Sequence, residues 1–497
     1  MALPLTFRER SAAGRKQRKH MRRADHAGWT PHQRTESPIK LLEASVRGRV
    51  PALVDLKNQR MSLSPFAFYR GAVPVMAYDL SLAQNTAIHS QLCGDAHVRN
   101  LGAFDGPDGR LVFDINDFDE TIAGPFEWDV KRMATSLILA GRGINAKNSD
   151  CAESAAIFLA NYRRSILRLS RMPVLEAARY QVRRLRDIST MSTIFTMAQR
   201  ATPMHNLLSL TESPSQPAPA PAKVPAKKQS ATKSKPAAIG AESAPAPVRI
   251  FKSDPPVLTR IHGAHAQRIL DSLANYTDSL LVERRHFFAQ YRPIDVAFKV
   301  VGTGSVGLRD YCVYMQGNNA KDPLFIQIKE EAASGYAPYL GGNTVPPYHQ
   351  GRRVVEGERA MQVQSDPLLG WTTIDGRDYL VRQLNDHKAS LDITQMKVAD
   401  LLGYASVCGE MLARGHSRSG DPAMLAGYIG TSERFDDAIT KFAVAYADQT
   451  ERDWKQFVRA MKPSASPKPA SKAPAKSETK PKTKSKPKPK PALKRKS

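Results

Sequence analysis

Residues 126–143 show a helical pattern of apolar and polar positions. Apolar side chains recur there at i, i+3, i+4, i+7 and i+8, which places them on one helix face: Val130, Met133, Ala134, Leu137 and Ile138. A Gly-Pro turn comes directly before and suits a helix start. Residues 110–117 alternate between apolar and polar side chains, which predicts a short strand. Acidic side chains therefore lie at a strand end and in the loop before a helix.

Residues 294–334 have a different pattern, which predicts three strands separated by a glycine-rich turn and a loop. Gly302, Gly304 and Gly307 lie in the turn, where glycine allows the backbone to approach a phosphate group closely. Lys329 ends the alternating run of the third strand. Its stem can lie along the sheet, with the ammonium group at the edge.

A helix, a strand and a second helix are predicted next, at residues 351–364, 376–386 and 398–420. The first helix carries Glu356 and Glu358. Each of these features is common by itself, because glycine turns usually only turn and lysines at strand ends are usually solvated. Their order is more specific: glycine turn, strand lysine, helix glutamate and further strand follow one another in the small lobe of protein kinases.

The net charge of +26 is concentrated in three segments. Residues 1–24, 213–248 and 461–497 carry +7, +4 and +12, so the rest of the chain is close to neutral. The second and third segments are rich in Pro, Ala and Lys and cannot build a hydrophobic core. Such segments bind nucleic acids and other polyanions through a salt-sensitive, sequence-independent attraction. The alternative is that they only keep the protein soluble.

These changes in composition divide the chain into six predicted regions. They are a basic flexible arm, a first helix-rich region, a Pro/Ala/Lys linker, a β-rich region, a second helical region and a disordered basic tail, at residues 1–25, 26–205, 206–249, 250–390, 391–460 and 461–497. The four cysteines are scattered without a CxxC pair, which favours a reducing compartment. No apolar run approaches the roughly 18–20 residues that a membrane span needs.

Seven acidic side chains lie within residues 91–120, several of them between strongly apolar residues. An unpaired buried charge is costly, so these carboxylates require cations: a metal, a basic side chain, or a substrate held by both. A purely structural alternative is an ion-paired loop, served by the nearby Arg99, Arg110, Lys131 and Arg132.

The strings GDAHVRN and FDINDFD within this stretch resemble the catalytic loop and the metal-binding strand of the protein-kinase-like superfamily, especially the aminoglycoside and choline phosphotransferases. An aspartate beside an acceptor hydroxyl can take its proton, and Mg²⁺ prefers oxygen ligands. The resemblance implies these roles: Asp95 as catalytic base, Asn100 and Asp117 as Mg²⁺ ligands, Asp114 or Asp119 as alternative ligands, and Asp129 as a carboxylate that braces the loop.

The order of these motifs is reversed relative to kinases, because the catalytic-loop string comes about 200 residues before the small-lobe pattern. Residues 401–420 resemble the helix that normally leads into the catalytic loop, yet they lie near the end of the folded region. We therefore expect a circularly permuted, two-lobed α+β fold with a helix-rich large lobe. This hypothesis requires Lys329 to approach Asp117.

Three longer strings are similar to the bacterial domain-of-unknown-function family 2252, and the similarity covers most of residues 30–455. They begin with MSLSPFAFYRG, LCGDAHVRNLG and RRVVEGERAM. The family resemblance implies a bacterial, cytoplasmic protein and favours Glu356 over Glu358 as the partner of Lys329. It also adds Arg70, whose role is either structural or directed at phosphate.

The expected function is transfer of a phosphoryl group from Mg-ATP to an unidentified hydroxyl-bearing acceptor. Lys329 would hold the α and β phosphates, Glu356 would orient Lys329, and the three glycines of the turn would cover the phosphates. Three alternatives remain: a pseudokinase or nucleotidyl transferase, a polyanion-binding protein that acts through its tails, and a metal-dependent hydrolase built from Asp95, His97, Asp114 and Asp117.

Overall fold

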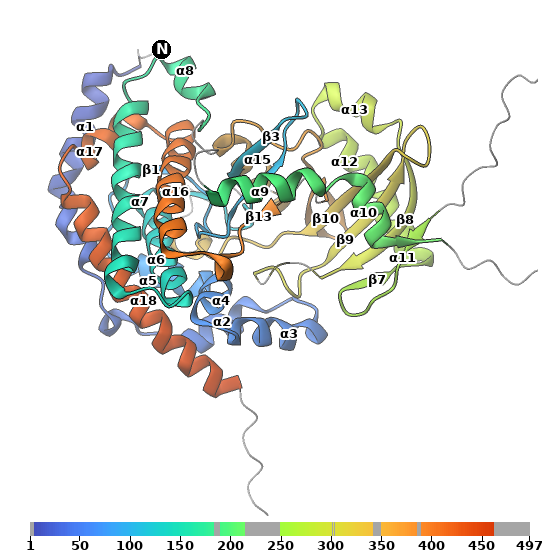
Figure 1. Cartoon of the computed structure of the whole chain (residues 1–497), viewed down its shortest axis with the longest axis horizontal. Coiled ribbons are helices and arrows are strands. Elements are labelled where there is room, and N and C mark those ends of the chain that lie inside the picture. The colour runs from blue at the N-terminus through green and yellow to red at the C-terminus, as the bar shows by residue number, and fades with distance from the viewer. Residues whose placement is uncertain are drawn as a thin grey trace, which may run out of the picture.

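The computed structural model describes residues 4–182, 189–213, 249–300, 302, 304–340, 349–384 and 389–461. Helices and antiparallel strands are segregated into two parts (Figure 1). The helical part contains α1–α9, α16–α18 and two small sheets. The sheet part contains a six-stranded sheet with α10–α13 and α15. The predicted mixture of helices and strands is thus confirmed.

Four long helices form the centre of the helical part: α6 (Glu127–Gly143), α7 (Asn148–Leu169), α16 (Val398–Ser419) and α18 (Arg434–Met461). The predicted helix at 126–143 is therefore confirmed as α6. It is buried on nearly all sides, because α7, α16 and α18 pack around it. Segments from both ends of the chain share this core, as the teal and orange helices in Figure 1 show.

The prediction of a flexible arm at residues 1–25 is wrong for its central part. Residues 7–20 form α1 (Phe7–His20), which begins with a capping box between Thr6 and Glu9. This helix packs against α17 (Pro422–Ile429), and Arg18 donates to the carbonyl groups of Gly427 and Tyr428. The arginines that suggested a solvated arm thus satisfy carbonyl groups at the end of another helix.

Short helices continue from α1 toward the boundary with the sheet part: α2 (Pro38–Ser45), α3 (Pro51–Ser62), α4 (Pro65–Gly71) and α5 (Val73–Ser81). A proline in the first turn of each helix suits its start. Later in the chain, α8 and α9 complete the helical part, at Val174–Arg179 and Ser189–Arg200. In Figure 1, α9 crosses in front of the boundary between the two parts.

The large sheet is antiparallel, with the strand order β11-β12-β10-β9-β8-β7. Its strands are β7 (Leu258–Arg260), β8 (Arg292–Lys299), β9 (Asp310–Gln316), β10 (Pro323–Glu330), β11 (Gly370–Ile374) and β12 (Arg377–Gln383). The strands predicted within 294–334 and 376–386 are confirmed. Successive β9 side chains alternate between two cores, since Val313 faces one and Cys312 and Tyr314 face the other.

Helices cover both faces of this sheet. One core includes side chains from α11 (Gly263–Asp271), α12 (Leu273–Ser279) and α13 (Val282–Phe288). The other includes Leu207 of α10 (Pro203–Leu210). The predicted helix at 351–364 is confirmed as α15 (Gln350–Met361), which packs on β11 and β12 and also joins the core of the helical part.

The predicted linker at 206–249 begins later than expected. Leu207 is buried against the sheet, and β5 (Thr211–Glu212) pairs with β6 (Ile250–Phe251). The remainder of this linker, and the predicted tail beyond residue 461, lie outside the described residues.

Two small sheets in the helical part hold the acidic stretch. β1 (His89–Leu92) pairs with β4 (Ile122–Pro125), and β2 (Leu101–Asp105) and β3 (Leu111–Ile115) form a hairpin that β13 (Ala389–Ser390) extends. The strand predicted at 110–117 is therefore confirmed as β3. The loops between these strands carry the carboxylates to the boundary with the sheet part.

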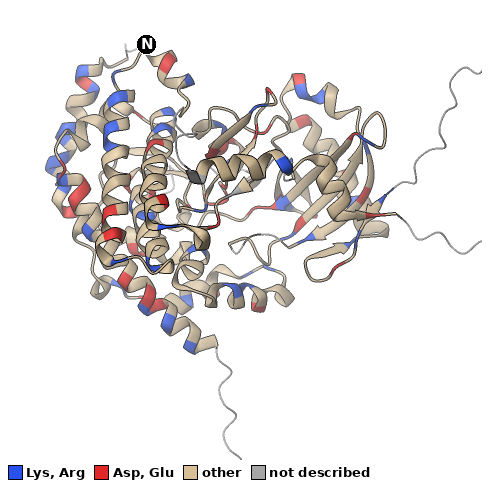
Figure 2. Ribbon diagram, in the orientation of Figure 1, with Lys and Arg blue, Asp and Glu red and all other residues tan. Residues whose placement is uncertain are grey.

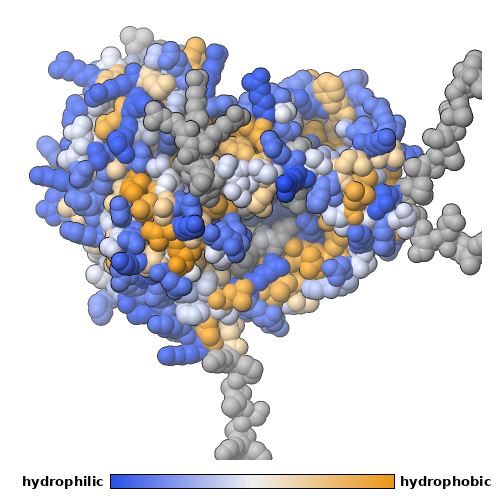
Figure 3. Space-filling model, viewed as in Figure 1, coloured by the Kyte–Doolittle hydropathy of each residue, from blue (hydrophilic) through white to orange (hydrophobic). Residues whose placement is uncertain are grey.

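Basic and acidic residues are interspersed along the helices and strands (Figure 2), which agrees with a nearly neutral folded region. Apolar residues on the face seen in Figure 3 form small patches between hydrophilic ones. No helix among the described residues is long and apolar enough to cross a membrane. All four cysteines are buried and free of disulfide bonds.

Candidate functional site

The candidate site lies where the loops around β1–β4 meet the end of β10. The ammonium group of Lys329 donates to both carboxylate oxygens of Asp119, at 2.5 Å to Oδ1, and lies 3.6 Å from Oδ1 of Asp117. These partners are 210 residues apart along the chain. The Lys329–Asp117 approach that the permutation hypothesis required is therefore present.

The charged groups around Lys329 influence one another's pKa values. Burial, followed by the neighbouring Asp117, raises the pKa of Asp119 to about 6. Burial, followed by the charge of Asp119, also raises the pKa of the nearby Glu331. Burial opposes the charge of Lys329, but the aspartates outweigh it and raise the pKa of its ammonium group. Arg353 and Arg382 act on the same carboxylates, so the cluster is a network of acidic and basic side chains beside a cavity.

Asp95 is held by two basic side chains. Its Oδ1 accepts from Nε and Nη2 of Arg132 at 2.8 and 2.6 Å, and its Oδ2 lies 3.4 Å from Nε2 of His97. Burial opposes ionisation, but Arg132 and His97 keep the pKa of Asp95 well below its ordinary value. Arg132 was expected only as part of a structural alternative, and it does pair with Asp95. The Asp95 carboxylate nevertheless remains accessible, because Asp95 also lines a cavity.

The loop that carries Asp95 is braced from α6. The carboxylate of Asp129 accepts from the backbone N–H groups of Cys93 and Gly94 at 2.8 and 3.0 Å. The predicted bracing role of Asp129 is thus confirmed. Gly94 has φ +81°, and a Cβ at this position would lie 2.1 Å from the carbonyl oxygen of Glu120. Only glycine fits there, so the two acidic loops approach each other closely.

Asn100 joins the same loops. Its Nδ2 donates to the carbonyl oxygens of Asp95 and Asp117, both at 2.9 Å. Its Oδ1 is buried and accepts no hydrogen bond within the described part of the chain. This oxygen therefore remains available beside Asp117, as the predicted pair of metal ligands requires. Across the described residues, no three His, Cys, Asp or Glu side chains form a group that could hold a metal ion.

The prediction of Asp114 as a metal ligand is wrong. Asp114 is fully buried within β3 and pairs with Arg414 of α16. Burial is the main influence on its carboxyl group and raises its pKa, although Arg414 opposes this. Because Asp114 lies inside the strand while Asp117 lies beyond its end, the two side chains enter different environments. The four residues of the hydrolase alternative are consequently not brought together.

Glu356 is also misassigned. It lies on the exposed face of α15 and pairs with Arg352, at 2.7 Å, whereas Lys329 pairs with Asp117 and Asp119. Glu358, two positions further along the helix, is buried. The family resemblance favoured the glutamate on the wrong face of the helix.

The contribution of α15 to the site comes instead from Arg353, which the sequence did not single out. Its guanidinium group donates to the carbonyl oxygens of Asp119, Thr121 and Ala332, the first at 2.8 Å and the last at 2.9 Å. Arg353 thereby fixes the acidic loop against the segment that follows β10. A buried arginine directed at backbone carbonyls has no sequence signature beyond its position on the helix.

The predicted glycine turn between β8 and β9 lies over the site, and the N-terminal helices hold it in place. Arg49 donates to the carbonyl oxygens of Gly304 and Val306 at 3.0 and 2.6 Å, and Lys57 of α3 donates to that of Gly304 at 3.2 Å. The N–H of Val50 donates to the carbonyl of Gly307, which has φ +92°. We call these contacts of Arg49, Val50 and Lys57 with the turn the clamp. Sequence reasoning did not predict the clamp, because its two segments are about 250 residues apart.

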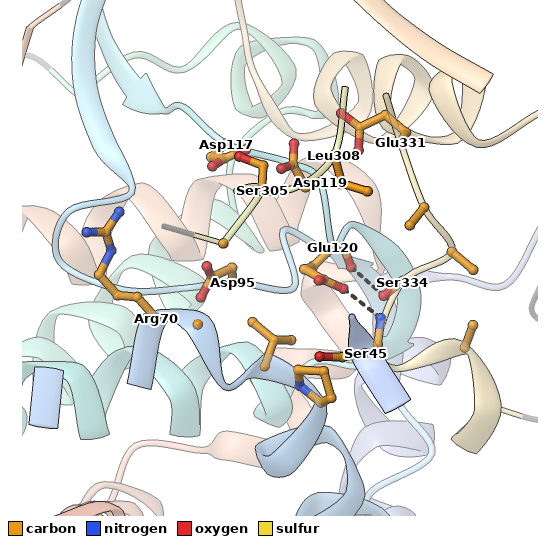
Figure 4. Close-up of a pocket in the computed structure, with 18 of the residues that line it drawn as sticks. Ser45, Arg70, Asp95, Asp117, Asp119, Glu120, Ser305, Leu308, Glu331 and Ser334 are labelled. Atoms are coloured by element: carbon orange, nitrogen blue, oxygen red, sulfur yellow. Dashed lines mark hydrogen bonds between the residues drawn. The ribbon is translucent and has the colours of Figure 1, made fainter. Parts of the chain in front are cut away.

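Two adjoining cavities open at this place. The smaller, of about 200 Å³, is lined by Asn100, Asp117, Lys329 and Arg382, among others. The larger, of about 370 Å³, is lined by Asp95 and Glu120 and by residues of α2–α5. In Figure 4, Arg70, Asp95 and Asp117 lie around one end of this larger cavity, while Glu120 and Ser334 lie at the other.

Five residues line both cavities and form what we call the neck: Arg70, His97, Asp117, Gly302 and Ser305. Gly302 and Gly304 of the predicted turn line the larger cavity, and Gly302 also lines the smaller one. The carbonyl of Gly307 is turned toward α3 instead. The structure thus brings together most of the predicted residues: Asp95, Asn100, Asp117, Gly302, Gly304 and Lys329.

Comparison with protein families agrees with the family resemblance of the sequence. The family model described as "Uncharacterized protein conserved in bacteria (DUF2252)" matches residues 49–460. The chain belongs to this family. Comparisons with curated proteins and with solved structures give no match. The match begins at the clamp residue Arg49 and includes every residue of the neck.

Proposed function

We propose that the protein is a phosphotransferase that moves the terminal phosphoryl group of Mg-ATP to a hydroxyl-bearing acceptor. One observation carries this proposal. Lys329, Asp117 and Asn100, whose buried Oδ1 accepts no hydrogen bond among the described residues, line one cavity beneath a glycine turn. Protein kinases use these same parts to hold the nucleotide and its metal ion.

Asn100 and Asp117, which line the same cavity, would hold Mg²⁺. It prefers hard oxygen ligands, commonly one or two from the protein and the rest from water and phosphate. When bound, the ion supplies positive charge next to the phosphates. The half-exposed carboxylate of Asp117 and the Oδ1 of Asn100, which accepts no hydrogen bond among the described residues, are the features that suit such a cation.

The residues of this chain divide the remaining work between the two cavities. In the smaller cavity, Lys329 binds phosphate oxygens and the turn at Gly302 covers them. In the larger cavity, Asp95 orients the acceptor hydroxyl and receives its proton. Arg132 keeps Asp95 ionised and correctly placed before the acceptor arrives. Alignment and charge account for most of the catalysis in transfers of this type.

We further propose a kinase-like, circularly permuted fold. The hydroxyl of Ser419, at the end of α16, lies 3.5 Å from the carbonyl oxygen of Gln91 in β1. A Cβ on Gly420 would lie 2.4 Å from the hydroxyl of Ser90. A chain joined at this point would run from α16 directly into the loop of Asp95. Such a rearrangement is tolerated when the joined ends are close in space.

The setting that fits this function is the cytoplasm, where ATP is plentiful and cysteines stay reduced. The acceptor is a molecule small enough for the larger cavity, about 370 Å³, and the basic tails would add polyanion binding that does not affect the reaction.

The test measures the stability of the full chain with ATP, with Mg²⁺ and with both. A ligand that binds only the folded state raises the free energy of unfolding by about 2.7 kcal/mol at a hundredfold excess over its dissociation constant. We expect this increase for wild type with Mg-ATP and its loss in Asp117→Asn. The control is Asp108→Asn, an exposed aspartate of the same acidic stretch, which should behave as wild type.

Absence of an increase with ATP, GTP or CTP in the wild-type protein would contradict the proposal. If binding is found, γ-labelled ATP identifies acceptors in fractionated metabolites. Transfer of AMP instead of phosphate to a product would show nucleotidyl transfer, the alternative that uses the same cavity.

A further inference from the structure

Arg70 occupies the neck between the two cavities without a carboxylate partner. It lies at the end of α4, lines both cavities, and in Figure 4 approaches Asp95 from one end of the larger one. Its Nε lies 3.3 Å from Nε2 of His97. Within the described part of the chain, no Asp or Glu forms an ion pair with its guanidinium group.

The carboxylates that could neutralise Arg70 are already bound elsewhere. Asp95 accepts two hydrogen bonds from Arg132, and Asp117 and Asp119 surround Lys329. Arg70 is only partly exposed, so leaving its charge without a close counter-ion costs free energy. A structural arginine would normally be paired, as Arg132 is. The position of Arg70 instead suits an anion that arrives with a ligand.

The geometry identifies where that anion lies. The neck is where a group passing from the smaller to the larger cavity must cross, and Asp95 faces it from the larger cavity. A phosphoryl group in transfer carries its charge on three equatorial oxygens. The planar guanidinium group presents parallel N–H donors that match such oxygens.

We propose, on the basis of the phosphotransferase function above, that Arg70 is a catalytic residue whose guanidinium group contacts the phosphoryl group as it crosses the neck. The bond between the γ-phosphorus and the β–γ bridging oxygen breaks, and a bond from that phosphorus to the acceptor oxygen forms. The acceptor proton passes to Asp95, and ADP leaves with the bridging oxygen. Arg70 contributes most when the phosphoryl group lies between donor and acceptor.

The experiment compares two ligands of the full chain by calorimetric titration in the presence of Mg²⁺. One is a non-hydrolysable ATP analogue, which represents the ground state. The other is ADP with aluminium fluoride, which imitates the planar phosphoryl group in transfer and requires no acceptor. The variants are Arg70→Gln, Arg70→Lys, and the control Arg110→Gln, which removes an exposed positive charge that lines neither cavity.

We expect Arg70→Gln to bind the aluminium fluoride complex about 100-fold more weakly, while its affinity for the ATP analogue changes less than about threefold. Arg70→Lys keeps the charge but loses the planar pair of donors, so an intermediate loss is expected. Arg110→Gln should bind both ligands within about threefold of wild type, because it lies outside both cavities.

The possible failures are distinguishable. If wild type binds both ligands and Arg70→Gln binds both equally well, the role of Arg70 is wrong and the proposed function stands. Equal weakening of both ligands in Arg70→Gln also overturns it, because the residue then serves ground-state binding only. If wild type binds neither nucleotide, the proposed function itself fails. Should Arg70→Gln not fold, the comparison of Arg70→Lys with Arg110→Gln decides.

Discussion

Asp114 and Asp117 lie only three residues apart in the acidic stretch, yet they differ in burial, in their ion-pair partners and in access to a cavity. Asp114 pairs with Arg414 in the core, where their side chains are 0 and 2 % exposed. Asp117 meets Lys329 at the wall of a cavity, and the side chain of Asp117 is 50 % exposed. The first cluster is a single ion pair, whereas the second is a network in which several carboxylates meet Lys329 and Arg382.

This difference separates charges that maintain the fold from charges that can bind a ligand. A balanced, dry ion pair leaves no capacity for another ion, and removing one partner strands the other. A network of charges at a cavity wall tolerates substitution better, because water reaches it, and a carboxylate exposed there can receive a cation. Four predictions test this distinction, in order of decreasing effect on stability.

The largest effect is expected for Asp114→Asn. The substitution leaves the charge of Arg414 buried without its partner, so we expect the free energy of unfolding to fall by about 3–5 kcal/mol. Urea denaturation of the full chain measures the loss. The double variant Asp114→Leu/Arg414→Met should recover most of it, since no buried charge remains. A loss below about 1 kcal/mol in the single variant would show that the pair is not structural.

Lys329→Met should destabilise the protein less, by about 2 kcal/mol at pH 8, because the stranded carboxylates face a cavity. The loss should shrink toward pH 5. Asp119 already has a pKa of about 6 beside the ammonium group, and without it this pKa rises further. The folded variant then holds more protons than the unfolded chain, so its stability falls as pH rises.

Denaturation at pH 5, 6.5 and 8 checks this trend. The control is Lys321→Met, an exposed lysine in the turn before β10. It should show the same small difference from wild type at each pH. A loss in Lys329→Met that is equal at all three pH values would contradict the assigned role of Asp119.

Lys57 extends the comparison to a buried cation in the glycine-turn clamp. Burial, followed by Arg49, lowers the pKa of Lys57 to about 7. Between this value and about 10.4, the unfolded lysine holds a proton that the folded one has lost, so stability contributed by this site rises with pH. Relative to Lys57→Met, the wild-type protein should gain roughly 1.5 kcal/mol between pH 7 and 8.5. A flat difference over this interval would place the pKa of Lys57 elsewhere.

The smallest effect is expected for Glu356→Ala. Its pair with Arg352 is an exposed i, i+4 pair, which contributes about 0.3–0.5 kcal/mol. Stabilisation by Mg-ATP should be unchanged, since Glu356 does not contact Lys329. Arg353→Met, from the buried face of the same helix, should lower stability by more than 1 kcal/mol. If Glu356→Ala instead abolished stabilisation by Mg-ATP, this result would support the pairing of Glu356 with Lys329 that the family resemblance implied.

The sequence by itself determined the local elements and much of the candidate site. Apolar periodicity identified α6, β3, α15 and the strands around the glycine turn, because each pattern reflects which face of an element meets a core. The motif resemblance singled out Asp95, Asn100, Asp117 and Lys329, and these residues do lie together.

Only the tertiary structure decided which charge pairs with which. Asp114 and Asp119 lie in the same acidic stretch, yet their partners lie 300 and 210 residues away. Arg353, the clamp at the glycine turn and the isolation of Arg70 depend in the same way on packing between distant segments. Periodicity records the burial of a side chain within its own element, but electrostatic partners are chosen by distances across elements, which exist only after the chain has folded.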